Sequence, residues 1–211
     1  MSSNKAANLA KFLLEINAVK LNPDNPFTWT SGIQSPIYCD NRMVLSFPEV
    51  RTFVKNELAA LARQYFPQTE VIAGIATAGI AHGALMADVM GLPNCYVRPE
   101  PKKHGMKNQI EGHLVAGSKV LLVEDLISTG KSSLQAVQAV REAGAEVIGL
   151  VALFTYGFED AKQRFVEANV PFYTIASFPV LAEVAVEHGY LNADKLEIVK
   201  SFAQDPINWK Q

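Results

Sequence analysis

The sequence is poor in cysteine, which narrows the kinds of protein it can be. Its 211 residues include two cysteines, Cys39 and Cys95. They lie too far apart in sequence to form a disulfide framework or a zinc-binding pattern. Two reduced thiols are typical of cytoplasmic proteins. The first residues also lack a basic start followed by an apolar run, so no signal peptide is predicted and we expect a cytoplasmic location.

Charge is also scarce and nearly balanced. Charged residues make up 19% of the chain, and the formal net charge is −2. Proteins that bind nucleic acids or anionic membranes in general are usually basic, so we expect neither partner. Residues 71–87 carry no Lys, Arg, Asp or Glu. They are too few to cross a bilayer, which takes about 20 apolar residues, and a strand, a tight loop and a helix explain them better.

Short apolar runs alternate with helical patterns from residue 70 onward. Strands are predicted at 71–75, 95–98, 120–123, 147–154 and 172–176, and helices at about 80–90, 132–143 and 158–169. Before residue 70, amphipathic helices are predicted to open near Ser3 and Ser46. Strands that are apolar on both faces and alternate with helices predict an α/β fold with a covered parallel sheet. Ligands of such folds bind beyond the carboxyl ends of the strands.

The most informative segment is 120–132, where an apolar strand runs into two carboxylates, Glu124 and Asp125. A Ser-Thr-Gly turn and a helix follow, and backbone N–H groups at such a turn suit a phosphate. Carboxylates repel phosphate, but they accept hydrogen bonds from sugar hydroxyls or help to hold a metal. The segment therefore predicts a ribose phosphate site.

Two alternatives apply to this segment. Gly130-Lys131-Ser132 resembles the end of a Walker A loop, but Asp125 stands where that motif needs glycine. An ordinary strand–turn–helix with solvated acidic residues stays open, although it does not explain why both carboxylates precede the turn.

Two further segments carry candidate chemistry. Residues 98–107 hold four cationic side chains against one acidic side chain, which suits a polyanionic leaving group; a solvated surface loop is the alternative. Residues 27–42 are rich in aromatic and polar groups. Phe27, Trp29 and Tyr38 are candidates for the flat walls of a site for a planar base, and core packing is the alternative for each.

Three motifs together resemble orotate phosphoribosyltransferases, a family of type I phosphoribosyltransferases. Residues 120–132 resemble the motif that binds phosphoribosyl pyrophosphate (PRPP), and Arg98-x-x-x-Lys102-x-His104-Gly resembles the catalytic loop. Ser-Gly-x-x-Ser-Pro-x-Tyr38 resembles the N-terminal hood. The resemblance implies one domain over 1–211, with a parallel sheet flanked by helices. Its core would span about 48–178, and its small hood about 1–42 plus the C-terminal segment.

The resemblance also implies roles for individual residues. Lys102 and His104 would be catalytic, and residues 74–81 would form the diphosphate loop. Orotate would contact Ser128, Phe27 and Tyr38. The residues implied to bind PRPP are Arg98, Lys102, His104, Glu124, Asp125, Leu126, Ile127, Ser128, Thr129, Gly130, Lys131 and Ser132.

The chain departs from some relatives at a few positions. Glu124 stands where many members have aspartate, and Lys103 where the loop is often acidic. Thr30 and the segment Tyr156-Gly157-Phe158 stand where some members have lysine and arginine. The partner of the orotate carboxylate is therefore left open.

The implied activity is transfer of ribose 5-phosphate from PRPP to orotate, giving orotidine 5′-monophosphate and diphosphate in pyrimidine biosynthesis. Mg²⁺ is the implied cofactor, and no protein side chain is assigned as its ligand. The family implies a homodimer in which the catalytic loop reaches the neighbouring subunit. Two alternatives remain: a transferase for a purine base, and a PRPP-sensing regulator that binds nucleic acid. The regulator should lack the Lys-x-His of the loop and carry a basic face.

Overall fold

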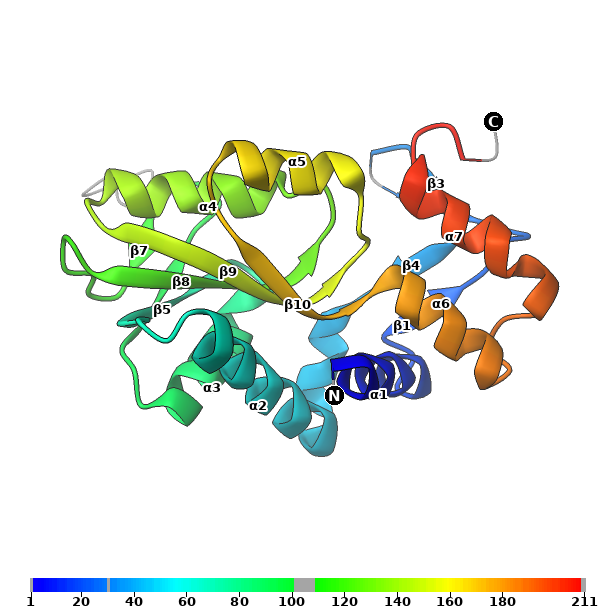
Figure 1. Ribbon diagram of the computed structural model, residues 1–211, viewed down its shortest axis with the longest axis horizontal. Coiled ribbons are helices and arrows are strands. Elements are labelled where there is room, and N and C mark those ends of the chain that lie inside the picture. Colours follow the sequence, from blue (N-terminus) through cyan, green and yellow to red (C-terminus); the bar gives the residue numbers. More distant parts are fainter. Residues whose placement is uncertain (1, 30, 101–108, 210–211) are drawn as a thin grey trace.

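A six-stranded sheet forms the centre of the molecule in the computed structural model, which describes residues 2–29, 31–100 and 109–209 (Figure 1). All its neighbouring strands are parallel except the last pair. In spatial order the strands are β10 (Phe172–Ser177), β9 (Glu146–Thr155), β8 (Lys119–Ile127), β5 (Val71–Ile75), β6 (Asn94–Val97) and β7 (Ile110–Glu111). The predicted α/β fold with a mainly parallel sheet is confirmed.

The predicted strands are all present, but β8 is longer than the sequence indicated. It continues past Val123 through the acidic pair to Ile127, because its ladder with β9 runs on to the pair Ile127↔Thr155. The expectation that the carboxylates follow the strand is therefore wrong: they lie within its last residues. The antiparallel edge strand β7 was not predicted, since two residues carry no alternation pattern.

Helices cover both faces of the sheet, as Figure 1 shows. One face carries α2 (Pro48–Tyr65) and α3 (Gly79–Met90), and the other carries α4 (Lys131–Glu142) and α5 (Glu159–Glu167). α3 follows β5 and α4 follows β8 within a few residues, so the loops at the carboxyl ends of these two strands lead directly into the two helices. These loops are the ones in which the sequence predicted ligand contacts.

A smaller lobe, the hood, is built from both ends of the chain. Its N-terminal elements are α1 (Ser2–Glu15), β1 (Val19–Leu21), β2 (Phe27–Thr28), β3 (Gln34–Ser35), β4 (Ile37–Cys39) and η1 (Asn41–Ser46). Its C-terminal elements are α6 (Phe178–Glu187), η2 (Ala193–Lys195) and α7 (Leu196–Gln204). The strands pair as two antiparallel ribbons, β1 with β4 and β2 with β3.

Contacts across the whole sequence hold the two ends of the chain together in the hood. The Lys195 ammonium lies 2.8 Å from an Asp24 carboxylate oxygen, and the Trp29 ring meets the Phe202 ring edge-on at 5.6 Å. The aromatic side chains of Phe165, Phe178 and Phe202 are buried. No helix in the described ranges is both long and apolar enough to cross a membrane.

Candidate active site

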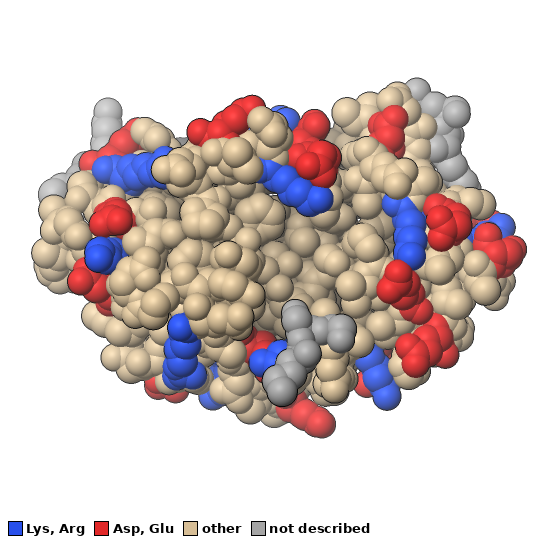
Figure 2. Space-filling view, in the orientation of Figure 1, with Lys and Arg blue, Asp and Glu red and all other residues tan. Residues whose placement is uncertain are grey.

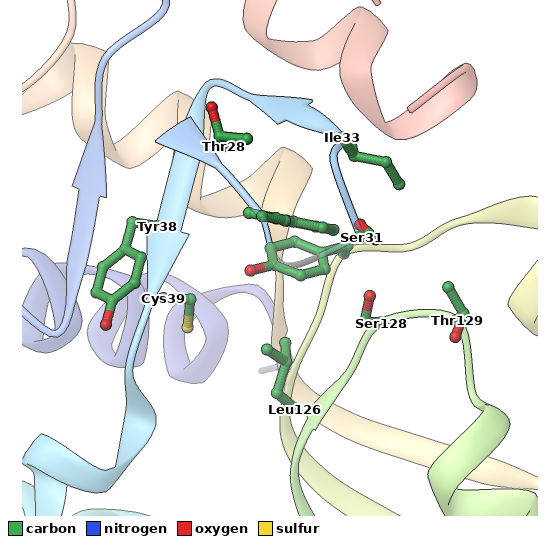
Figure 3. Close-up of a pocket in the computed structure, with 10 residues that line it drawn as sticks. Thr28, Ser31, Ile33, Tyr38, Cys39, Leu126, Ser128 and Thr129 are labelled. Carbon is green, nitrogen blue, oxygen red and sulfur yellow. The ribbon is translucent and has the colours of Figure 1, made fainter. Parts of the chain in front are cut away.

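A cavity of about 500 Å³ lies between the hood and the carboxyl end of β8. In Figure 3, Thr28, Tyr38 and Cys39 of the hood strands lie across the opening from Ser128 and Thr129 of the core. The residues that line it are Thr28, Trp29, Ser31, Ile33, Tyr38, Cys39, Leu126, Ser128, Thr129 and Tyr156. The sequence prediction of a site at the strand ends thus coincides with the join between the two lobes.

Aromatic rings form one wall of this cavity. The Tyr156 ring lies 5.0 Å from that of Trp29 and stacks on that of Phe158 at 5.4 Å. Phe154 and Phe178 meet Tyr156 edge-on. Such packing fixes the ring planes, and a rigid flat wall suits a planar heterocycle.

The residues predicted to contact a base divide into two groups. Ser128 and Tyr38 line the cavity, and Tyr38 is 43% exposed. Phe27 does not line it, because its ring packs against that of Tyr38 at 5.8 Å and supports it from the side. Tyr156 was missed as a site residue. An aromatic residue after a buried strand is usually core, and only the fold shows its edge in the cavity.

Tyr156 offers the cavity a hydrogen-bond donor. The residue is 3% exposed and lines the cavity, and its hydroxyl has no hydrogen-bond partner among the described residues. Burial raises the pKa of Tyr156 well above its ordinary value, and nearby Cys39 and Asp125 act in the same direction. The phenol is therefore neutral at physiological pH and keeps its proton to donate.

The acidic pair lies at the end of β8, behind the turn. Glu124 is 6% exposed; one of its oxygens accepts a hydrogen bond from the Asp125 N–H at 3.1 Å, and the other lies 3.5 Å from the Ser133 hydroxyl. The Asn41 side chain of the hood donates to the Asp125 carbonyl at 2.9 Å. The hood thus holds the backbone of the pair at Asp125, and α4 contacts the Glu124 side chain.

Both carboxyl groups can accept hydrogen bonds, but their ionised forms are disfavoured by burial. Burial raises the pKa of Glu124 well above its ordinary value, and repulsion by Asp125 raises it further. Burial also raises the pKa of Asp125, against which the cation Arg42 acts in the opposite direction. A ligand that donates hydroxyl hydrogens to these oxygens would relieve their desolvation.

The turn after β8 has the features of an anion site. Gly130 is the residue before α4 and has φ 75°, and the N–H groups of Thr129 and Gly130 have no partner among the described residues. The first N–H groups of α4 lack helical partners as well, and the helix dipole favours negative charge there. This agrees with the predicted role of the turn as a phosphate cradle.

Gly130 is required for two reasons, and a substitution can separate them. A Cβ added there would lie 2.8 Å from Cε2 of Phe165, whereas Gly189, with a similar φ of 76°, faces open space. We expect Gly189→Ala to lower the free energy of unfolding by about 1–2 kcal/mol, the cost of the left-handed backbone. Gly130→Ala should cost about 1–3 kcal/mol more through overpacking. Urea unfolding measures both, and equal losses would show that the Phe165 contact does not matter.

The other residues predicted to bind PRPP lie around the turn and differ in which cavity they line. Leu126 and Thr129 line the cavity, and Lys131 lines a second cavity of about 350 Å³ on the other side of Thr129. Ser132 lines a small hollow together with Ala76 and Arg98. Ile127 differs, since its side chain is fully buried and its carbonyl accepts hydrogen bonds from Tyr156 and Thr155.

Arg98 stands at the base of the basic loop. Its guanidinium Nη1 lies 3.2 Å from a Glu111 carboxylate oxygen, and its Nε has no hydrogen-bond partner among the described residues. The Arg98 N–H donates to the Gln109 carbonyl at 2.7 Å, which joins the two stems of the loop. Lys102 and His104 lie outside the described residues.

The predicted diphosphate loop, residues 74–81, runs from the end of β5 into α3. Ala76 faces the hollow that Arg98 and Ser132 also line. Gly79, at the start of α3, packs directly on the carbonyl of Val123, which leaves no room for a side chain. The small residues therefore serve helix–strand packing, and the loop also borders a region lined by a cation.

Comparison with known proteins agrees with this geometry. A family model described as phosphoribosyl transferase domain matches residues 50–184. The orotate phosphoribosyltransferase of Bacillus subtilis (strain 168) is 51% identical over 198 residues, covering 94% of this chain and 92% of the relative. That of Cytophaga hutchinsonii is 48% identical, covering 99% of this chain and 100% of the relative.

A solved structure has the same architecture. The crystal structure of orotate phosphoribosyltransferase from Aeropyrum pernix superposes with a TM-score of 0.75 at 28% identity, covering 87% of this chain and 99% of that chain. The similarity includes the hood as well as the sheet, because nearly the full length is matched. The chain therefore belongs to the orotate phosphoribosyltransferase family.

Proposed function

We propose that the protein transfers ribose 5-phosphate from PRPP to orotate, releasing diphosphate and forming orotidine 5′-monophosphate for pyrimidine biosynthesis. The observation that carries the proposal is a juxtaposition. A flat aromatic cavity, an anion-binding turn and a buried acidic pair meet at the end of one strand, β8. These parts match the base, the 5′-phosphate and the ribose hydroxyls of a nucleotide product.

The chemistry asks for electrostatics more than for a protein nucleophile. The bond from ribose C1 to the diphosphate oxygen breaks as the base nitrogen attacks, and the sugar becomes oxocarbenium-like. Glu124 and Asp125 accept hydrogen bonds from the ribose hydroxyls and favour the positive charge that develops on the ring. The turn at 128–132 holds the 5′-phosphate, so the reacting atoms stay in line.

The donor set fits Mg²⁺ bound largely through the substrate. Within the described ranges, no three His, Cys, Asp or Glu side chains are grouped as a metal cage. Mg²⁺ commonly binds through one or two carboxylates together with substrate phosphates and water, and Glu124 and Asp125 supply the carboxylates. When bound, the ion would offset negative charge on the diphosphate.

The basic loop completes the site. Lys102 contacts the diphosphate as it leaves, and His104 and Arg98 bind PRPP, with Arg98 adding a cation at the loop base. The segment that carries the loop follows β6 and is followed by β7, the edge strand of the sheet. The active form is a homodimer in which each loop serves the neighbouring site. The free thiols Cys39 and Cys95 support a cytoplasmic location.

The base cavity indicates how orotate is bound. None of the described residues that line it is Lys or Arg, so neutral hydrogen-bond donors bind the base and its carboxylate. Tyr156 is the donor that the aromatic wall holds most firmly. Ser31, Ser128 and Thr129 supply further hydroxyls.

Replacing Tyr156 by phenylalanine tests this assignment. The change keeps the ring and removes a hydroxyl that has no described partner, so the melting temperature should not change. We expect KM for orotate to rise about tenfold, the value of roughly one hydrogen bond, with a smaller change in kcat. Tyr190→Phe, on an exposed ring far along the hood, is the control. An unchanged KM in Tyr156→Phe would remove the hydroxyl from base recognition.

The activity itself is tested by following the ultraviolet absorbance of orotate with purified protein, PRPP and Mg²⁺. Loss of absorbance that stops with EDTA is the expected result. A transferase for a purine base would instead leave orotate untouched and convert hypoxanthine, guanine or adenine in the same assay. On the face shown in Figure 2, basic and acidic side chains are interspersed around the rim, which does not favour a nucleic-acid-binding regulator.

A further inference from the structure

We propose that Arg164, on α5, is a positioning residue for the 5′-phosphate: its hydrogen bond to the Thr129 carbonyl aims the Gly130 N–H at the anion. The inference rests on the proposed function, in which the turn at 128–132 holds the phosphate. Arg164 lies 35 residues from Thr129 in sequence, outside every motif that pointed to the site.

The contact is specific. Nη1 of Arg164 lies 3.1 Å from the Thr129 carbonyl oxygen. Thr129 lines both the base cavity and the second cavity described above, and Arg164 and Lys131 line the second one, on the far side of the turn. The same cavity is lined by Glu159, Asp160 and Asp205, so its own charge is mixed. Arg164 therefore acts on the turn from outside, not as a member of the phosphate cradle.

The geometry of the peptide bond transmits this contact. The bond between Thr129 and Gly130 is trans, so its C=O and N–H point in opposite directions. With the carbonyl held toward α5, the Gly130 N–H must point away from α5. That N–H has no described partner, which leaves it free for a ligand. Glycine at 130 would otherwise let the peptide plane rotate with little penalty.

A fixed platform makes the contact effective. Phe165, the next residue of α5, is 1% exposed, and its ring packs against Phe172 at 4.6 Å. The same ring fills the space where a Cβ of Gly130 would be. Two adjacent residues of α5 thus hold the turn. Phe165 fixes the position of Gly130, and Arg164 fixes the orientation of the peptide group between Thr129 and Gly130.

The test compares Arg164→Ala with Arg141→Ala. Arg141, on α4, also donates to a backbone carbonyl at 3.1 Å, that of Ala168, but it has no contact with the turn. The readouts are KM for PRPP, the inhibition constants of ribose 5-phosphate and of diphosphate, and the melting temperature. Arg164→Lys, which can still donate to the carbonyl, is the conservative variant.

We expect Arg164→Ala to raise KM for PRPP and the inhibition constant of ribose 5-phosphate about tenfold, the effect of losing roughly one well-aimed hydrogen bond to a charged group. Diphosphate inhibition and Arg141→Ala should stay within about twofold of wild type, and Arg164→Lys should recover part of the loss. Unchanged ribose 5-phosphate inhibition, or an equal loss for diphosphate, would overturn the proposal.

The outcome is separable from the activity itself. If the wild-type protein fails to convert orotate, the proposed function fails. Ribose 5-phosphate binding, measured by the ligand-induced rise in melting temperature, still decides the role of Arg164. A wild-type shift that Arg164→Ala loses and Arg141→Ala keeps supports the assignment, and equal shifts in all three proteins contradict it.

Discussion

Lys102→Ala is expected to lower kcat about 100- to 1,000-fold, the usual effect of removing one group that stabilises charge in a transition state. Residues 98–107 concentrate four cations beside the end of β6, in a chain of net charge −2. The departing diphosphate carries most of the charge that develops during the reaction. KM for orotate should change little, because the base cavity is built from the hood and β8.

The matched control is Lys119→Ala. Lys119 begins β8, at the end of the strand opposite the acidic pair, so it is far from the leaving group along the sheet. We expect its kcat to stay within about twofold of wild type, as for most surface substitutions. Steady-state kinetics at saturating PRPP and orotate measures both variants. Similar losses in the two would remove the basic loop from the mechanism.

Glu124→Gln should reduce kcat/KM by about 100-fold or more and, at the same time, stabilise the fold. Activity falls because the amide offers the ribose hydroxyls a weaker acceptor and no negative charge. Stability rises because burial and Asp125 both disfavour the ionised form of Glu124. The amide also keeps the local bonds, since its oxygen can accept from the Asp125 N–H and its NH₂ can donate to Ser133.

The pH dependence of stability tests the second half of this prediction. The pKa of Glu124 is raised in the folded protein, so the native state binds more protons than the unfolded chain above the ordinary value of 4.5. Wild-type stability must then fall as pH rises from that value until Glu124 ionises in the fold. Glu124→Gln lacks this loss, so its advantage in melting temperature should widen from pH 4.5 upward.

Glu142→Gln provides the control for that experiment. Glu142 is exposed on α4 and accepts a hydrogen bond from Gln138 at 2.9 Å. Its replacement should produce no advantage that grows with pH. A melting temperature of Glu124→Gln below wild type at pH 8 would mean that the ionised carboxylate stabilises the native state, contrary to the burial argument.

The sheet and the phosphate turn were predictable because their signals are local. The run at 71–75 is apolar at every position, and the structure buries all of it in β5. The turn at 128–130 could be predicted because a glycine stands between an apolar strand pattern and a helical pattern. The end of β8 was less predictable. Glu124 and Asp125 interrupt the apolar pattern of the strand, but the backbone pairing of β8 with β9 continues past them to Ile127.

The family resemblance predicted which segments form the hood, but the side-chain contacts inside it could not be predicted from the sequence. Trp29 meets Phe202 only because the C-terminal helices return across the N-terminal strands, and no local pattern encodes that contact. The same holds for Tyr156. Its sequence context predicts a core aromatic residue, and only the structure shows its ring packed against Trp29. Arg164 is a charged residue on an exposed helix in the sequence, and only its distance to Thr129 distinguishes it.

The most direct test of the central claim is a phosphorus NMR spectrum of wild-type protein incubated with PRPP, Mg²⁺ and orotate, beside a sample without orotate. The account predicts that the PRPP resonances are replaced by those of orotidine 5′-monophosphate and free diphosphate in equal amounts, and only when orotate is present. Diphosphate released at the same rate without orotate would show hydrolysis, and PRPP that persists unchanged with orotate would show no transfer; either result would contradict the account.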